Sequence, residues 1–267
     1  MSGVEWSLLD PKGPIAADEK TLILTAFALM LVVVVPVIFM TFAFAWKYRA
    51  GNKAATYAPE WDASAKIEAI IWLVPAVIVV VLSVLVWRSS YALSPYRPIV
   101  STAKPVQVEV VAMGWKWLFI YPDLGIATVN RLEIPTGVPV SFRLTSDSVM
   151  GSFFIPRLGG QIYAMAGMQT RLHLVADQPG TYAGLNTQFD GDGFPGMRFD
   201  TVATSTQGFD AWVRQVKQSS MALDEGAFKK LEVPSKNNSP EYFSAVEPHL
   251  FDHVMHKYMS DMFTETR

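Results

Sequence analysis

Three histidines near the C-terminus, His249, His253 and His256, are separated by four and then three residues. This spacing places them on one face of a helix, where imidazoles could bind zinc or copper. No fourth ligand is evident nearby, so we expect a solvated helix face rather than a metal centre. The remaining histidine, His173, stands in the alternating sequence QTRLHLV and is expected on the solvent-facing side of a strand.

A second group of polar residues lies in GLNTQFDGDGFPGM, Gly184 to Met197. Its DGDG sequence resembles part of a calcium loop, but the regularly spaced ligands and the terminal glutamate of such loops are missing. We therefore expect a tight turn. The chain contains no cysteine, which excludes disulfides, thiolate metal sites, thiol catalysis and attachment of a lipid to a cysteine.

Glu68 lies at the start of an apolar segment, in AKIEAIIWLVP. Two interpretations are open. The carboxylate could be a charge at the level of lipid headgroups, stabilised by Lys66 and by the positive end of a helix dipole. It could also accept protons, because ionisable groups at a membrane edge often mark proton or ion routes.

The composition indicates a membrane protein. The chain has 267 residues, of which 51% are hydrophobic, and its mean hydropathy is +0.24. Its formal net charge is −2 and it has no basic stripe, so nothing favours binding to nucleic acid.

Two uncharged segments are long enough to cross a bilayer. Thr21 to Trp46 would rise about 39 Å as a helix and Ala69 to Trp87 about 28 Å, against about 30 Å of hydrocarbon. Membrane helices tolerate proline, so Pro36 does not argue against this. We predict a transmembrane hairpin over residues 21–91, with helices at about 21–46 and 67–88; two buried core helices are the disfavoured alternative.

Basic residues set the expected orientation. The loop 47–66 contains Lys47, Arg49, Lys53 and Lys66, which assigns it to the cytoplasm. Residues 1–20 then form an extracytoplasmic tail, and both termini lie on the periplasmic side. These first residues are polar, and no cleavable signal peptide is visible in them.

The rest of the chain predicts a β domain followed by helices. KPVQVEV, VPVSFRLTS and QTRLHLVA alternate apolar and polar residues, and Gly and Pro separate them. Residues 104–205 are therefore expected to form an antiparallel sandwich or barrel. FDAWVRQVKQ and EYFSAVEPHLFDHVMHKYMSDM predict a helical region over residues 206–267.

Three motifs in this order resemble subunit II of the haem-copper terminal oxidases, over roughly residues 8–215. EAIIWLVP is similar to the E-x-x-x-W-x-x-P of that family's second helix. MGWKWLFIYP resembles the aromatic segment that begins its outer domain, and VMGSFFIPRLG with GTYAGLNTQFDGDGFPGM resembles its two-part copper region. The matching residues in the first two motifs are Glu68, Trp72, Pro75, Trp115, Trp117 and Tyr121. The resemblance implies a cupredoxin-like fold for residues 104–205.

The resemblance also implies that the copper ligands have been replaced. Copper-bearing members have a histidine five residues before the proline of the first part, and G-x-C-x-E-x-C-x-x-x-H-x-x-M in the second. The corresponding positions here are Gly151, Asn186, Gln188, Asp190, Phe194 and Met197. Only the methionine is retained, and a binuclear copper pair requires bridging thiolates. We expect no metal in this chain.

Without copper, the chain resembles the cytochrome bo-type ubiquinol oxidase branch, whose electrons arrive within the membrane. That resemblance implies a partner subunit I that carries haem b, a second haem (o or a), copper and ubiquinone, with further small membrane subunits, in a bacterial cytoplasmic (inner) membrane. The complex would oxidise ubiquinol, reduce oxygen to water and translocate protons. Tyr163 replaces an aspartate of cytochrome c-using relatives, so no cytochrome c docking is expected.

The resemblance gives roles to three residues. Glu68 lies where the family's K-pathway takes up protons, so it is our proton-entry candidate. Trp115 and Trp117 correspond to electron-entry aromatics of copper-bearing relatives, and here we expect them to be packing residues. Two alternatives are kept: a copper-binding cytochrome c oxidase subunit II with unusual ligands, and a stand-alone membrane-anchored binding or assembly protein.

Overall fold

The computed structural model describes residues 7–55 and 61–264, in two compact units. One unit is Thr21–Ser94, and the other combines Met1–Lys20 with Pro95–Arg267. Three stretches lie outside the described residues: 1–6 of the predicted tail, 56–60 of the predicted cytoplasmic loop, and 265–267 of the predicted helical region.

Two long helices form the apolar unit, α1 (Pro14–Lys47) and α2 (Ala65–Ala92). The most apolar 18-residue window of each has a mean hydropathy of 3.0 and contains no buried residue, so each is suited to cross a membrane with its side chains facing lipid or another protein. α1 begins at Pro14, earlier than the predicted start at residue 21. The uncharged run begins only at Thr21, but the charged residues that precede it are compatible with a helix. The fixed φ of proline suits the first helical position.

Residues 7–20 are not a free tail. The Lys12 N–H donates to the Arg157 carbonyl at 2.7 Å, and the Lys12 carbonyl accepts from the Asp177 N–H at 2.8 Å. The Glu19 carboxylate accepts from the Gly160 N–H at 3.1 Å. The segment before the apolar run is therefore fastened to loops of the β-rich unit to which it belongs.

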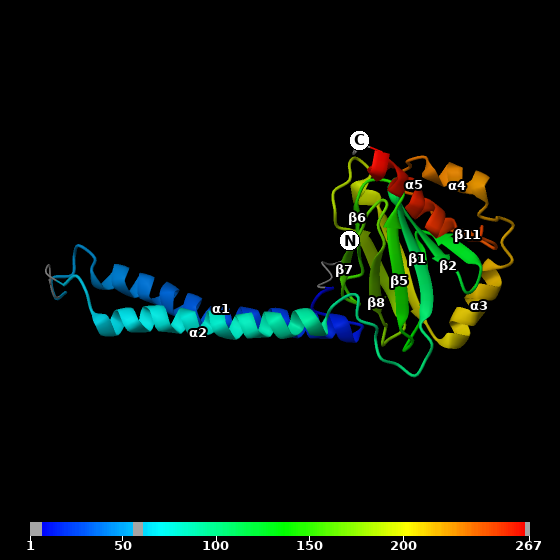
Figure 1. Ribbon diagram of the computed structural model, residues 1–267. Helices are drawn as coiled ribbons and strands as arrows, with labels where there is room; N and C mark the ends of the chain where they lie inside the picture. The colour runs from blue at the N-terminus through cyan, green and yellow to red at the C-terminus, as the bar shows by residue number, and fades with distance from the viewer. Residues whose placement is uncertain (1–6, 56–60, 265–267) are drawn as a thin grey trace. The chain divides into compact units, whose positions relative to one another are not determined.

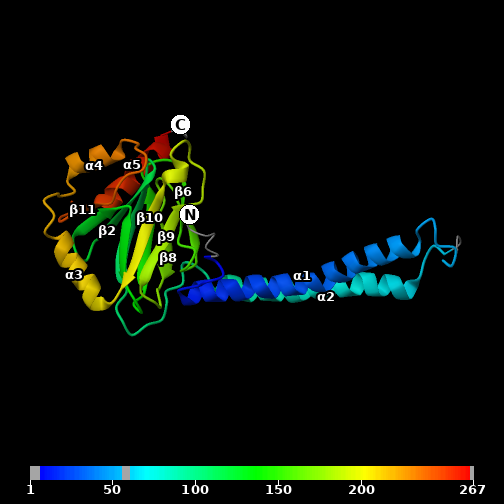
Figure 2. The same cartoon turned by 180° about the vertical axis from the view of Figure 1, so that it is seen from behind.

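Eleven strands of the β-rich unit form a sandwich of two sheets (Figures 1 and 2). The first sheet has the order β11-β3-β2-β1-β5-β8 and the second β4-β10-β9-β6-β7. The strands are β1 (Val106–Met113), β2 (Lys116–Tyr121), β3 (Ile126–Val129), β4 (Arg131–Pro135), β5 (Val140–Ser146), β6 (Gly151–Phe154), β7 (Gln161–Ala164), β8 (Thr170–Leu174), β9 (Gly180–Asn186) and β10 (Arg198–Thr204), with β11 (Glu241–Phe243) added at one edge.

The sequence predicted an antiparallel sandwich or barrel, but the sandwich contains two parallel strand pairs. β1 pairs with β5 in parallel, and so does β10 with β4. Both pairs join strands far apart in the chain, a connection that the local alternation of residues does not encode. The resulting order brings β6 beside β9, with Phe153 opposite Asn186.

Between the two sheets lies an apolar inner core. It contains Trp117, Phe142, Phe153 and Phe199, all at most 3% exposed. The helix α3 (Thr206–Val216) contributes Phe209 and other apolar residues to this core and contacts β4 and β10.

The outer face of the first sheet carries a second core, which the alternation of residues along the strands does not predict. Its strand residues, such as Val111 and Leu118, pack with Phe228 of α4 (Glu225–Glu232) and Phe251 of α5 (Leu250–Thr264). The last six residues of β1 are buried, so both faces of this strand are covered. In Figure 1, α5 crosses the first sheet beside α4.

The C-terminal region is only partly helical. EYFSAVEPHLFDHVMHKYMSDM was expected to be a helix, but Glu241–Phe243 form β11, which pairs antiparallel with β3, and α5 begins at Leu250. Pro248 disfavours a helical conformation for the residue before it, and His249 adopts a φ of 63°. These two features separate the strand from the helix.

Candidate functional site

The positions singled out in the two-part motif gather at one end of the sandwich. Gly151 begins β6 and Asn186 ends β9, and these strands pair. A Cβ atom added to Gly151 would lie 3.8 Å from Asn186 Oδ1 and 3.7 Å from the Trp117 ring. The first and second parts of the motif therefore meet, although 34 residues separate Ser152 from Asn186.

Asn186 is the centre of this end of the domain. It is 4% exposed, and its Oδ1 accepts from the Ser152 N–H at 2.8 Å and the Gln188 N–H at 3.1 Å. Its Nδ2 donates to Asp190 Oδ2 at 3.1 Å and to Met197 Sδ at 3.3 Å. An amide has two acceptor sites and two donor hydrogens. All four are used here, so the carboxamide joins β6, β9 and the loop that follows β9.

Asp190 and Met197 are held by this amide. Met197 is 1% exposed, and its carbonyl also accepts from the Asn186 N–H at 3.1 Å. Burial raises the pKa of Asp190, while its own backbone N–H and the Asn186 side chain oppose the shift. Asp190 Oδ1 is buried and has no hydrogen-bond partner among the described residues. The site thus disfavours a charged carboxylate.

Gln188 and Phe194 lie further from the centre. Gln188 reaches Asn186 through its backbone N–H. Phe194 starts the short 3₁₀ helix η1 (Phe194–Gly196), and its ring contacts the 72% exposed Phe189 with centroids 5.6 Å apart. The side chain at the histidine position of the motif therefore packs against another aromatic ring at the surface.

Trp115 covers the loop from the neighbouring hairpin. It lies between β1 and β2 with a φ of 63°, an uncommon conformation for a bulky residue. Its Nε1 donates to the Asp190 carbonyl at 3.1 Å, and its ring lies directly against Gly193. Any side chain at position 193 would collide with this ring, so the glycine of the DGDG sequence is a packing requirement.

Trp117 belongs to the inner core. It is fully buried, and its ring meets those of Phe153 and Phe199 at centroid distances of 5.4 and 5.8 Å in edge-to-face geometry. Its Nε1 has no hydrogen-bond partner among the described residues. Both tryptophans thus lie next to the Asn186 site, one outside the sandwich and one inside.

Glu68 lies in the other unit, in the first turn of α2. Its backbone N–H donates to the Ser64 carbonyl at 2.9 Å, and its side chain is exposed. Trp72, one turn later, is 77% exposed. This end of α2 therefore presents a carboxylate and an indole to the surroundings of the helix.

The histidines form no metal site among the residues that the structure describes. His249, His253 and His256 are exposed on or next to α5, and His249 Nδ1 lies 3.9 Å from Asp252 Oδ2. Across residues 7–55 and 61–264, no group of three or more His, Cys, Asp or Glu side chains is placed to hold a metal ion. His173 is partly exposed on β8, and burial, followed by Arg171, lowers its pKa.

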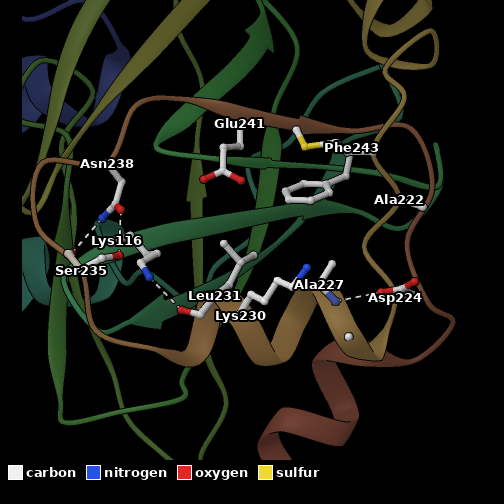
Figure 3. A pocket seen from close by; sticks show the side chains of 12 residues that line it. Lys116, Ala222, Asp224, Ala227, Lys230, Leu231, Ser235, Asn238, Glu241 and Phe243 are labelled. Atoms are coloured by element: carbon white, nitrogen blue, oxygen red, sulfur yellow. Dashed lines mark hydrogen bonds between the residues drawn. The ribbon is translucent and has the colours of Figure 1, made fainter.

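A cavity of about 570 Å³ lies between α4 and β11, among residues that the motifs did not single out (Figure 3). Glu241 and Lys230 extend along it, while Lys116 lies at one end with its ammonium group turned to the end of α4. Lys116 is 2% exposed. A lone charge in the apolar run GWKWLF is the signal that the sequence offers for this residue.

Ser152 is the second residue that sequence reasoning missed. It is fully buried next to Gly151, and its Oγ accepts from Thr187 Oγ1 at 2.9 Å. Its carbonyl also accepts from the Thr187 N–H at 3.1 Å. One polar residue in the apolar sequence GSFFIP was the only signal, because its partners come from a distant strand.

Comparison with known proteins identifies the family. Residues 217–262 match the family model described as COX Aromatic Rich Motif. The chain is 53% identical over 258 residues to the cytochrome bo(3) ubiquinol oxidase subunit 2 of Pseudomonas aeruginosa, covering 97% of this chain and 78% of the relative. It is 52% identical over 264 residues to the ubiquinol oxidase subunit 2 of Acetobacter aceti, covering 98% and 86% of the two chains.

Among solved structures, the periplasmic domain of subunit II of cytochrome oxidase from Bradyrhizobium japonicum matches with a TM-score of 0.41 and 19% identity. The match covers 49% of this chain and 99% of that one. The two apolar helices, the two-sheet sandwich and the C-terminal helices of the structure confirm the predicted fold class, a membrane hairpin followed by a cupredoxin-like domain and a short helical tail. The two apolar helices and the sequence relatives support a protein of the inner membrane. With about half of its residues identical over nearly its whole length to such relatives, the chain belongs to the ubiquinol oxidase subunit 2 family of haem-copper oxidases.

Proposed function

We propose that this chain is the subunit II of a proton-translocating ubiquinol oxidase that transfers electrons from ubiquinol to oxygen, and that it carries no redox centre itself. The observation that carries the proposal is the Asn186 carboxamide, whose four hydrogen-bonding positions are all used within the protein. An amide so engaged has no lone pair free for a metal. Gly151, Asn186, Gln188, Asp190, Phe194 and Met197 are then former ligand positions that do not bind copper.

Electrons would accordingly bypass this chain. Haem b, a second haem (o or a), copper and ubiquinone belong to subunit I in this proposal, and further small subunits complete the complex. Trp115 and Trp117 serve in packing, which their contacts with Gly193, Phe153 and Phe199 support. The hairpin holds the chain in the membrane with both termini on the periplasmic side, and cytochrome c does not dock.

A metal and haem inventory of the purified complex tests this proposal. We expect copper in the proportion of one subunit I site per complex, and oxygen consumption with ubiquinol but not with reduced cytochrome c. Two additional copper ions per complex, together with rapid oxidation of cytochrome c, would favour the copper-binding alternative. Purification of this chain without a haem-containing partner would favour the stand-alone alternative.

Glu68 is proposed to assist proton uptake. This proposal is supported by the position of Glu68 in the first turn of α2, a 28-residue apolar helix, where its carboxylate is exposed. Glu68→Ala should lower ubiquinol-dependent oxygen consumption severalfold, and Glu68→Asp should restore part of it. Asp62→Asn, which neutralises an exposed carboxylate in the adjoining loop, is the control. Full turnover in Glu68→Ala would exclude this role.

A further inference from the structure

The C-terminal residues 217–262 have no part in the function proposed above. We propose that they act as a clamp on the three loops around Asn186, supplying from outside the cross-links that copper ligation supplies in copper-bearing relatives. These rim loops are the β1–β2 turn (114–115), the β5–β6 loop (147–150) and the β9–β10 loop (187–197). The inference rests on the proposed function, because it takes the Asn186 site as metal-free.

The first contact of the clamp is made with Lys116, which lies on β2 directly after the first rim loop (Figure 3). Lys116 Nζ donates to the Leu231 carbonyl at 2.8 Å and to the Val233 carbonyl at 2.9 Å. These carbonyls lie at the C-terminal end of α4, where helices leave acceptors without intrahelical partners. A buried ammonium thus fixes the point at which the chain leaves α4.

The segment that follows α4 lies on the β1–β2 turn. The Ser235 N–H donates to the Gly114 carbonyl at 3.3 Å, and a Cβ atom on Gly114 would come within 2.9 Å of Pro234 Cα. Lys236 Nζ lies 5.4 Å from the centroid of the Trp115 ring. The fit between turn and segment is therefore too close to admit even a methyl group.

Through Trp115, these contacts reach the β9–β10 loop. The Trp115 indole bonds the Asp190 carbonyl and packs on Gly193. The segment also touches this loop directly, because a Cβ atom on Gly196 would lie 2.5 Å from Asn237 Oδ1. The loop that carries four of the former ligand positions is held from the outside at both its middle and its end.

The third rim loop is held by α5. Lys257 Nζ donates to Asp147 Oδ1 at 2.9 Å and to Glu232 Oε1 at 2.7 Å, and Tyr258 Oη donates to the Asp147 carbonyl at 2.9 Å. The Asp147 side chain is 2% exposed. Asp147 lies four residues before Gly151, so α5 fixes the entry to the first part of the motif.

Covering the sheet does not require these contacts. The apolar residues of α4 and α5 already bury its outer face. The polar contacts of the same region instead converge on the end of the sandwich where Asn186 lies. In a metal site, binding free energy stabilises the loops that supply the ligands; here the hydrogen bonds of the C-terminal region serve that purpose.

The test is hydrogen–deuterium exchange on the purified, full-length oxidase complex. Gly114→Ala inserts one methyl group between the turn and Pro234. Gly226→Ala is the matched control, since a Cβ there meets its nearest neighbour at an ordinary 3.5 Å. We expect the amides of Asn186, at the end of β9, and of the β9–β10 loop, including Gln188 and Phe194, to exchange about tenfold faster in Gly114→Ala only.

A milder variant guards against misfolding. Tyr258→Phe removes one hydrogen bond to the Asp147 carbonyl and should speed exchange about threefold in the β5–β6 loop. Unchanged rim exchange in both variants, or an equal rise throughout the sandwich, would overturn the clamp. A chelator arm separates this outcome from a failure of the proposed function: rim exchange that rises when the parent complex is treated with chelator reveals a bound metal, whatever the variants do.

Discussion

The two faces of the first sheet are buried by different chemistry. Its inner face meets the second sheet through aromatic and aliphatic side chains, such as Phe119 of β2 and Phe199 of β10, whose ring centroids lie 5.1 Å apart. Its outer face meets α4 and α5 through apolar residues and also through charged groups such as Lys116 and Arg143. The inner interface is set by shape, whereas the outer one is also set by directional bonds.

This difference separates strength from specificity. Apolar burial stabilises in proportion to area but tolerates rearrangement. Hydrogen bonds and ion pairs add little net free energy, yet they disfavour any arrangement that leaves a buried charge unpaired. The inner core therefore holds the sandwich together, and the outer layer fixes where the C-terminal region lies.

The largest effect is expected from Phe153→Ala in the inner core. Phe153 is fully buried and contacts the rings of Trp117, Phe142 and Phe199. Truncation should lower the free energy of unfolding by about 3–5 kcal/mol, because the rigid sheets cannot collapse into the cavity. Denaturant unfolding of the full chain in detergent measures it. Phe251→Ala, on the outer side, should cost less, since α5 can shift; equal losses would remove the proposed contrast.

Lys116→Met tests the directional bonds of the outer layer. It leaves the Leu231 and Val233 carbonyls without the ammonium that they now share, which should cost about 1–3 kcal/mol. Lys230→Met changes an exposed lysine of α4 and should alter the free energy of unfolding by no more than about 0.5 kcal/mol. The same unfolding assay serves both. A Lys116→Met protein as stable as its parent would mean that shape alone places α4.

Sequence reasoning could predict the elements that local pattern encodes. The uncharged run from Thr21 to Trp46 indicates a membrane helix because hydrocarbon excludes charge over its whole thickness. The alternating residues around Phe142 indicate a strand because successive side chains of a strand point to opposite faces of the sheet, one buried and one exposed. The position of α5 was not predictable, since the outer face of β1 combines the polar Gln107 and Glu109 with apolar residues and no local signal indicates what covers that face.

The candidate site divides in the same way. The resemblance implied that Gly151 and Asn186 belong to one former metal site, because it supplied the topology. The hydrogen bonds of Asn186 could not be predicted: Ser152 comes from a strand distant in sequence, and its backbone N–H is available to any acceptor. The contact of Trp115 with Gly193 depends on a left-handed backbone at the tryptophan, which residue type disfavours.

A smaller effect should appear in the pH dependence of the outer layer. Burial raises the pKa of Glu109, and the neighbouring Asp252 adds to the shift, while Arg143 opposes it. The folded protein then binds a proton more readily than the unfolded chain. The contribution of Glu109 to stability is therefore greatest at low pH. It falls as the pH rises from the ordinary pKa of a glutamate, near 4.5, through the raised pKa in the folded protein.

The comparison with Glu109→Gln isolates this effect. The variant should gain stability relative to the parent as the pH rises from about 4 to 7, since glutamine does not titrate. Glu247→Gln, a substitution at an exposed position near α5, is the control. Parallel curves for the parent and Glu109→Gln would mean that Arg143 fully offsets burial, and the outer layer would then be insensitive to pH in this range.

The smallest effects are expected at the helix N-caps, one on each side of the comparison. Ser205 Oγ accepts from the Gly208 N–H at 3.1 Å at the start of α3, which packs into the inner core. Asp224 Oδ1 accepts from the Ala227 N–H at 2.8 Å at the start of α4 in the outer layer. Replacing either residue by alanine should cost about 1 kcal/mol.

Salt should reduce the loss only for Asp224→Ala, because a carboxylate also interacts with the helix dipole and that interaction is screened. Unfolding at low and high ionic strength distinguishes the two. Equal salt responses would show that charge contributes no more to the outer layer than to the inner one, and the contrast would then rest on the buried groups alone.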